Sequence, residues 1–313
     1  MMSRLTLVYL ILFAIAYPPH KNEGCQHCHM IENASTRHTY AYEGGKNDVV
    51  YASAERGYES EDSSDDVVYF AAHASFPRKP YDEYYGLVAT IDVYGYNISR
   101  GQMSASSIWV ANVGNWSKES YNSIRVGWMV SPEIYGDSHT HFYTHWIRDG
   151  GRTGCYNMDC PGFQLEKGSK ITPGAIINSA CTSGGSSQTI TMKVFKDKTS
   201  ENWWVYYGMN NDTPTAVGYY PANLFTTLAT KANSISVGGE SRARRSLPTP
   251  PMGSGSLPSE KAASVSNLQF IDQNGQAIVI QSDLPIIAKE PKCYYVSPII
   301  GAKFFYGGPA GCF

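Results

Sequence analysis

The chain has 313 residues, of which 42% are hydrophobic and 17% charged, and its formal net charge at pH 7 is −2. This length allows one large domain or two small ones, and the balanced charge gives no sign of a surface for nucleic acid. The 23 tyrosines, 6 tryptophans and 29 glycines favour strands and tight turns over helices. We therefore expect a soluble globular protein rich in β-structure.

The first 16 residues have the pattern of a secretory signal peptide. Arg4 supplies the positive charge, and an apolar run follows at 5–16. Ala14 and Ala16 form a small-x-small cleavage site, so the mature chain is expected to begin at Tyr17. The apolar run is too short to span a bilayer. We expect a secreted, extracellular protein with no membrane partner. Localisation to a cell wall or a vacuole would also be consistent with a signal peptide.

Residues 17–66 are expected to be a disordered leader. They carry few large apolar residues, and "ERGYESEDSSDD" (55–66) is acidic without any periodicity. Cys25 and Cys28, in "CQHCHM", resemble half of a zinc site. A structural zinc site needs four ligands, and the chain has no second pair of this kind. We therefore expect no metal or other cofactor.

Residues 67–313 are expected to form one all-β domain. Short runs of alternating apolar residues recur between turn signals, which indicates an antiparallel β-sandwich or barrel. The clearest runs are 86–96, 106–113, 123–130, 189–197, 202–209, 234–240, 277–281 and 303–308. One short helix is expected near 221–232, where a proline precedes a stripe of apolar residues at helical spacing. The Pro/Ser/Gly-rich segment 240–256 is expected to be a long loop.

The cysteines and glycosylation sequons agree with secretion. An oxidising compartment favours disulfides, and seven cysteines leave one thiol over. The five outside the leader are Cys155, Cys160, Cys181, Cys293 and Cys312. Cys181 is expected to be the unpaired one. Sequons of the Asn-x-Ser/Thr type occur at Asn33, Asn97, Asn115 and Asn211.

The run "SIRVGWMV" (123–130) places an arginine on one face of a strand. Its apolar side chains alternate, so Ile124, Val126 and Trp128 point one way. Arg125 points the other way, together with a glycine and a methionine. For most strands this second face is solvated and carries no function.

Several segments together resemble the neprosin domain, a largely plant family of secreted proteins. They occur in order along roughly 67–313 as "YYGLVATIDV", "GWMVSPEIYGD", "TGCYNMDCPGF", "NWWVYYG", "VGYYPANLF", "VGGE", "PMGSGSLP" and "FYGGPAGC". The resemblance implies a seven-stranded antiparallel β-sandwich, in agreement with the expected strands. It also implies that Cys155 pairs with Cys160 and that Cys293 pairs with Cys312.

The best-understood members of this family are glutamic endopeptidases that cleave after proline in acid. Two glutamates face each other in their site, and because two close carboxylates do not both ionise easily, one keeps its proton. The ionised group activates water, and the protonated group donates to the leaving group. The resemblance implies that Glu240, in "VGGE", is one catalytic glutamate. The second lies in an I-E-x-G-W strand, which here reads "IRVGW", so Arg125 stands in its place.

This substitution leads to two alternative functions. Arginine stays protonated and cannot act as a base, and beside Glu240 it favours the carboxylate form. The first alternative is therefore a protein with impaired or lost catalysis that keeps a cleft for a peptide or protein ligand, such as a proline-rich one. The second is an active acid endopeptidase in which Glu133 or Asp137 replaces the missing acid. The leader shows none of the motifs of the family's prodomain.

Two further motifs have weaker functional interpretations. "HTHFYTHW" (139–146) places His139, His141, Tyr143 and His145 on one face, where two histidines at i, i+2 could hold zinc. The usual interpretation is an exposed polar face, and we favour it. "RARR" (242–245) matches a basic processing site, but a solvated loop is the more common context for such a run.

Overall fold

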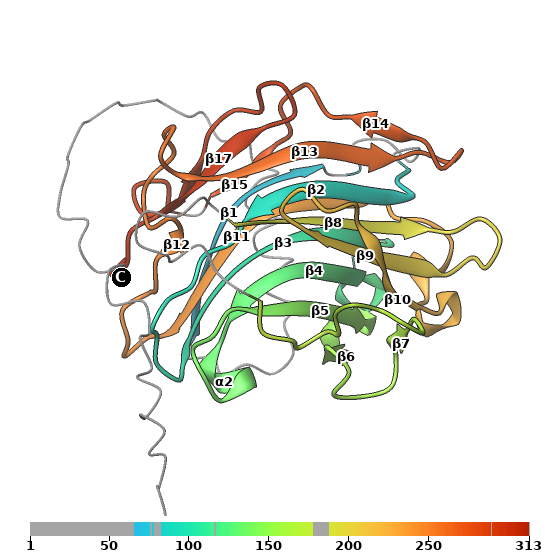
Figure 1. Ribbon diagram of the computed structural model, residues 1–313, viewed down its shortest axis with the longest axis horizontal. Helices are drawn as coiled ribbons and strands as arrows, with labels where there is room; N and C mark the ends of the chain where they lie inside the picture. Colours follow the sequence, from blue (N-terminus) through green and yellow to red (C-terminus); the bar gives the residue numbers. More distant parts are fainter. Residues whose placement is uncertain are drawn as a thin grey trace, which may run out of the picture.

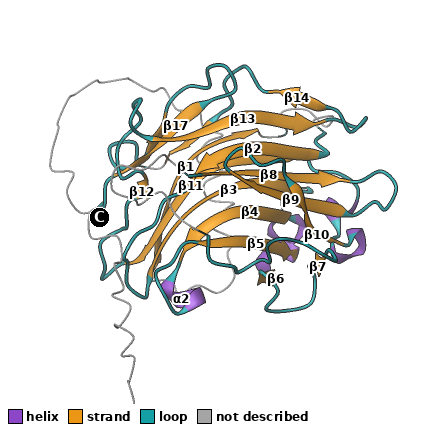
Figure 2. Cartoon of the chain, viewed as in Figure 1, coloured by secondary structure: helices purple, strands orange, loops and turns teal. Residues whose placement is uncertain are grey.

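The strands of the computed structural model form two antiparallel sheets that lie face to face (Figure 1). The structure describes residues 66–75, 77, 83–115, 117–177, 188–288 and 290–312. The expected all-β sandwich is therefore confirmed, with strands dominating the chain (Figure 2). The predicted signal peptide, almost all of the predicted leader with Cys25, Cys28 and Asn33, and Cys181 lie outside the described residues.

The first sheet has seven strands in the order β15-β1-β11-β3-β4-β5-β6. Their bounds are β1 (Asp66–Ser75), β3 (Gln102–Asn112), β4 (Asn122–Val130), β5 (His141–Arg148), β6 (Thr153–Tyr156), β11 (Ser234–Arg244) and β15 (Ile286–Ala288). Short 3-10 turns, η2 (Lys118–Ser120) and η3 (Asp149–Gly151), lie in the connections between these strands. The long neighbours β1, β11, β3, β4 and β5 form the middle of this sheet.

The second sheet has ten strands, eight of them in the order β12-β17-β13-β2-β8-β9-β10-β7. Their bounds are β2 (Gly86–Asp92), β7 (Gln164–Leu165), β8 (Thr189–Lys196), β9 (Trp203–Met209), β10 (Thr215–Tyr220), β12 (Met252–Gly253), β13 (Ala263–Ile271) and β17 (Phe304–Gly308). The short strands β14 (Ala277–Val279) and β16 (Tyr295–Val296) pair with β13 and β17.

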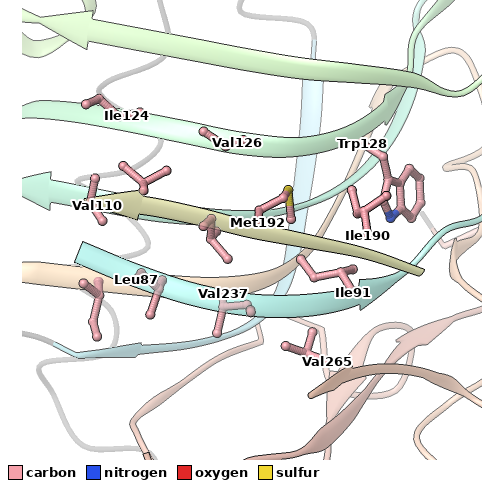
Figure 3. Close-up of a cluster of buried hydrophobic side chains, with 14 of the residues drawn as sticks. Leu87, Ile91, Val110, Ile124, Val126, Trp128, Ile190, Met192, Val237 and Val265 are labelled. Carbon is pink, nitrogen blue, oxygen red and sulfur yellow. The ribbon is translucent and has the colours of Figure 1, made fainter. Parts of the chain in front are cut away.

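The core lies between the two sheets and is built by the alternation that the sequence predicts. Val126 and Trp128 of β4 meet Ile190 and Met192 of β8 in one apolar cluster (Figure 3). These four side chains are fully buried. Burying each such side chain contributes about 1.5–3 kcal/mol relative to leaving it exposed. The opposite residues of β4, including Arg125, therefore project from the far side of the first sheet.

The prediction of one continuous helix near 221–232 is wrong. This segment forms two 3-10 turns instead, η4 (Ala222–Leu224) and η5 (Thr227–Ala229). The Asn122 side-chain oxygen accepts hydrogen bonds from the Thr226 backbone N–H at 2.8 Å and from its hydroxyl at 3.1 Å. These bonds take the place of helical ones, so the turns do not merge. The α-helix of the described chain is α2 (Pro132–Tyr135), and none of its helices is long and apolar enough to cross a membrane.

The loop predicted at 240–256 begins later than expected, because β11 continues to Arg244. Ala243 pairs with Gln102 of β3, while Arg244 pairs with Asp66 of β1. The first part of "RARR" is therefore a strand held on both sides. A processing protease would have to open this strand before it could bind the segment in an extended form.

Both expected disulfides are present. Cys155 pairs with Cys160 across a short turn, with 6.1 Å between the Cα atoms. Cys293 pairs with Cys312, with 5.9 Å between the Cα atoms, and fastens the C-terminal strand region to the preceding segment. The second bridge closes the longer loop, since its cysteines are 19 residues apart rather than 5.

Candidate functional site

The candidate site lies on the face of the seven-stranded sheet that points away from the other sheet, which we call the site face. On β11, Val237 joins the inter-sheet core, so Glu240 falls on the opposite side of the strand. On β3, Ile108 faces the core and Trp109 the site face. Arg125 of β4 follows the same alternation. Strand geometry thus places Arg125, Trp109 and Glu240 on one surface.

Arg125 and Glu240 meet although β3 lies between their strands. The Arg125 Nη1 atom donates to Glu240 Oε2 at 3.2 Å. Between them, Gly127, Ser107 and Gly238 form an in-register row across β4, β3 and β11. Because these three residues are small, the long arginine side chain has room to lie across the sheet toward Glu240.

The glycines of this row also meet a backbone requirement. A Cβ atom at Gly127 would lie 2.6 Å from the Ser107 Cβ atom. A Cβ atom at Gly238 would lie 2.5 Å from the Ala72 Cα atom, and its φ of +154° is rare for other residues. Both positions are therefore closed to larger residues by the packing of adjacent strands.

The ion pair is buried. Arg125 exposes 4% of its surface and Glu240 exposes 2%. The guanidinium carbon of Arg125 lies 4.9 Å from the centroid of the Trp109 ring, within the range of a cation–π contact. The indole N–H of Trp109 in turn donates to the Ser107 hydroxyl. Trp109 thus covers the arginine and is itself oriented by the small-residue row.

A second arginine reaches the same carboxylate. Arg242 Nη2 lies 3.6 Å from Glu240 Oε1, so Glu240 has a guanidinium beside each of its oxygens. The composition of 240–256 predicts a loop that includes Arg242, so the sequence did not predict the contact between Arg242 and Glu240. The spacing of Glu240 and Arg242 could have indicated it, because residues i and i+2 lie on the same face if the strand continues past Glu240.

His145 and Tyr143 also lie close to the pair. His145 is partly buried on β5, opposite Arg125 in the register, and its ring stacks on Tyr156 with centroids 4.0 Å apart. Burial, followed by the charges of Arg125 and Arg242, lowers the pKa of His145 well below its usual value. Burial, followed by the charge of Glu240, raises the pKa of Tyr143. The site therefore holds His145 in its neutral form and Tyr143 as a neutral phenol.

The two candidate replacement acids have other partners. Glu133, on α2, forms an ion pair with Arg244 at 3.4 Å, and about half of its side chain is exposed. Asp137 accepts a hydrogen bond from the His139 backbone N–H at 2.8 Å and contacts a His141 ring nitrogen at 3.0 Å. Neither carboxylate shares a described hydrogen-bond partner with Glu240.

The histidine-rich stretch divides between a loop and a strand. His141, Tyr143 and His145 lie on the site face of β5, as expected, whereas His139 precedes the strand. The other ring nitrogen of His141 lies 2.7 Å from the Gly174 carbonyl oxygen, so both nitrogens have protein partners. Within the described ranges, no three His, Cys, Asp or Glu side chains are grouped to hold a metal ion.

The asparagines of three sequons lie in the described chain and are exposed, namely Asn97, Asn115 and Asn211. Asn211 lies in the turn between β9 and β10, next to the Asp212 backbone N–H that donates to the Met209 carbonyl. This geometry leaves each amide accessible for modification.

Comparisons with known proteins give one family and several distant structures. The family model described as Neprosin matches residues 100–309. The crystal structure of scytalido-glutamic peptidase with a transition state analog inhibitor is similar at 8% identity and a TM-score of 0.40, covering 78% of this chain and 99% of that chain. SCP-B, a member of the Eqolisin family of peptidases in a complex with the tripeptide Ala-Ile-His, is similar at 9% identity and a TM-score of 0.36, covering 77% and 97%.

Proposed function

Because the chain belongs to the Neprosin family, we propose that it is a secreted, glutamic-peptidase-like protein that has lost catalysis at its ancestral site. The observation that carries this proposal is the buried ion pair between Arg125 and Glu240, with 3.2 Å between Nη1 and Oε2. An acid pair would need one proton donor and one base at this place. Here the two positions hold a permanent cation and a carboxylate.

The contacts of Glu240 support the loss of acid–base chemistry. Arg125 and Arg242 approach opposite oxygens of its carboxyl group. A guanidinium does not give up its proton at any relevant pH, so neither arginine can serve as a general base. Two cations beside the Glu240 carboxyl group favour its charged form. A carboxylate accepts hydrogen bonds but has no proton to donate to a leaving group.

The peptide-binding part of the proposal depends on the shape and chemistry of the site face. The row of Gly127, Ser107 and Gly238 carries no large side chain and is buried, as are its larger neighbours Trp109 and Tyr143, so a peptide reaches it only by displacing what covers it. A peptide backbone bound along this row would lie beside the guanidinium of Arg125. We propose that the family's substrate class, a peptide or protein segment such as a proline-rich one, is bound here without being cut.

A gain-of-function variant tests the proposal. Arg125→Glu restores two glutamates at the site, and an acid-dependent cleavage of proline-containing peptides should appear in the purified protein. Arg125→Glu combined with Glu240→Gln should lose that cleavage again, because the pair is broken. Arg152→Glu is the matched control, since it makes the same charge change at an exposed ion pair with Glu119.

Each outcome bears on one part of the proposal. Cleavage by Arg125→Glu, but not by the wild type or by Arg152→Glu, supports the loss of catalysis through Arg125. Equal cleavage by the wild type and all three variants would mean that chemistry occurs elsewhere and would contradict it. Binding without cleavage is measured separately, by titrating a fluorescent proline-containing peptide into wild type and Trp109→Ala. Loss of binding in Trp109→Ala supports the site face as the binding surface.

A further inference from the structure

The outer face of the ten-stranded sheet carries a cluster of aromatic side chains that the candidate site does not use. Ile190, Val194 and Val205 face the core, so their neighbours in the alternation face outward from β8 and β9. The outward aromatic residues of β8, β9 and β10 are Phe195, Trp204, Tyr206 and Tyr219, which we call the aromatic stripe. All four are partly exposed, on strands that lie side by side (Figure 1).

The stripe is ordered by strand register. Phe195 pairs with Trp204, and Trp204 pairs with Tyr219, so three rings form one row across three neighbouring strands. The Trp204 and Tyr219 ring centroids are 4.9 Å apart, and those of Phe195 and Tyr206 are 5.5 Å apart. Phe195 and Tyr219 are two strand spacings apart, about 9.5 Å. This length is comparable with that of a disaccharide unit.

One cation lies within the stripe. Lys193 Nζ lies 4.2 Å from the Phe195 ring centroid and 6.0 Å from that of Tyr206. Burial lowers the pKa of Lys193, because the flanking rings remove part of its water. Among the outward side chains that β8, β9 and β10 present in the described chain, none is a carboxylate. On the neighbouring strand β2, the carboxylate of Asp92 shares this outer face and accepts hydrogen bonds from Ser264. An anionic partner would therefore meet the positive charge of Lys193 on the three strands of the stripe.

Polar groups lie next to the rings. The hydroxyl groups of Thr191 on β8 and Thr90 on β2 lie 2.8 Å apart on the same outer face, where they can also bond to a ligand. The surface thus combines flat apolar rings, hydroxyls and one cation. Linked sugar rings have complementary chemistry, because they present flat C–H faces and hydroxyl edges.

We propose that the aromatic stripe binds an acidic polysaccharide, a chain of linked uronic acid rings. The sugar rings pack on Trp204 and Tyr219, and a carboxylate of the chain binds Lys193. The charge complementarity of Lys193 selects an acidic polymer over a neutral one, while the aromatic row supplies the contact area. This site lies on the other sheet from Arg125 and Glu240, so it is independent of the proposed function.

The test compares two polymers with the same sugar backbone, one with free carboxylates and one in which every carboxylate is a neutral methyl ester. Retention of the full secreted protein is measured by affinity electrophoresis in gels that contain polygalacturonate or its fully methyl-esterified form. The wild type should be retarded by the acidic polymer and much less by the ester, and added salt should weaken the retardation. Trp204→Ala should bind at least about tenfold more weakly, which corresponds to about 1.4 kcal/mol. Lys193→Met should lose the preference for the acidic polymer.

A matched control tests whether binding depends on Lys193 in particular rather than on any lysine that lies over an aromatic ring. Lys303 also lies over an aromatic ring, that of Phe305 at 4.9 Å, three strands away on the sheet. Lys303→Met should therefore bind like the wild type. If Trp204→Ala does not fold, as judged by near-ultraviolet circular dichroism, Lys193→Glu tests the site with every ring in place and should abolish binding. Absence of wild-type retardation, equal retardation by the ester, or unchanged binding by Lys193→Glu would each overturn the proposal.

Discussion

Arg125 of β4 and Glu240 of β11 form a buried ion pair across the intervening strand β3, with 3.2 Å between Nη1 and Oε2. The contact depends on three features. Strand alternation places both residues on the site face, the small row of Gly127, Ser107 and Gly238 lies between them, and Trp109 packs over the guanidinium. Charge and packing together therefore hold Arg125 against Glu240 on the site face.

Removing the carboxylate should destabilise the fold strongly. Glu240→Ala leaves two buried or half-buried arginines, Arg125 and Arg242, without this counterion. Breaking a buried pair in this way typically costs about 3–5 kcal/mol. Urea denaturation measures the loss. Glu119→Ala breaks the exposed pair with Arg152 and should cost less than about 1 kcal/mol. Similar losses for both variants would contradict the importance of burial.

The stability of the protein should depend on His145 in mild acid. Burial and the two arginines lower the folded-state pKa of His145, whereas in the unfolded chain it titrates near 6.5. The unfolded state therefore binds the proton first, and the stabilising effect of the neutral ring is complete above about pH 6.5. It is lost progressively as the pH falls below that value, by at most about 1.4 kcal/mol per pH unit.

The free energy of unfolding of the wild type and of His145→Gln, measured between pH 7 and pH 4.5, tests whether His145 makes stability fall as the pH falls. Titrations of the carboxylates contribute equally to both proteins, so the difference in free energy of unfolding isolates His145. The wild type should lose stability relative to His145→Gln as the pH falls. A constant difference for His145→Gln would show that the ring is not held neutral.

The two disulfides should differ in their effect on stability. In the chain-entropy model, removing Cys293–Cys312 costs about 3 kcal/mol and removing Cys155–Cys160 costs about 2 kcal/mol, because the first bridge closes a longer loop. Denaturation of Cys293→Ser and Cys155→Ser measures both losses. Non-reducing peptide mapping of the wild type should recover both bridges, and a Cys155–Cys181 peptide would overturn the pairing.

Secretion is a separate prediction from the first 16 residues. Expression of the full chain in a eukaryotic secretory host should yield a product in the medium whose N-terminus is Tyr17. Intact mass before and after glycosidase treatment should show glycans at one or more of the exposed sequons, namely Asn97, Asn115 and Asn211. A product retained in the cell with Met1 intact would contradict the signal peptide.

The sequence predicted the strands and the faces of Arg125 and Glu240, because alternation is a local pattern. The family resemblance also predicted that their side chains form an ion pair, and the structure confirms it. The register between β3, β4 and β11 that brings them together depends on the whole sheet, so the local pattern alone could not predict it. The prediction of a helix near 221–232 was wrong because Asn122, about 100 residues away, accepts hydrogen bonds from the Thr226 backbone N–H and hydroxyl. The role of Arg242 was missed because β11 extends into a segment whose composition resembles a loop.

Cleavage of proline-containing peptides by the unmodified protein tests the central claim most directly. The purified wild type should be incubated with such peptides from pH 3 to pH 6, beside Glu240→Gln, and the products measured by mass spectrometry. The account predicts no cleavage above that of Glu240→Gln at any pH, because the proposed function places Arg125 where a second acid would be needed. Robust acid cleavage by the wild type that disappears in Glu240→Gln would contradict it, since another group would then have to supply the missing proton transfer.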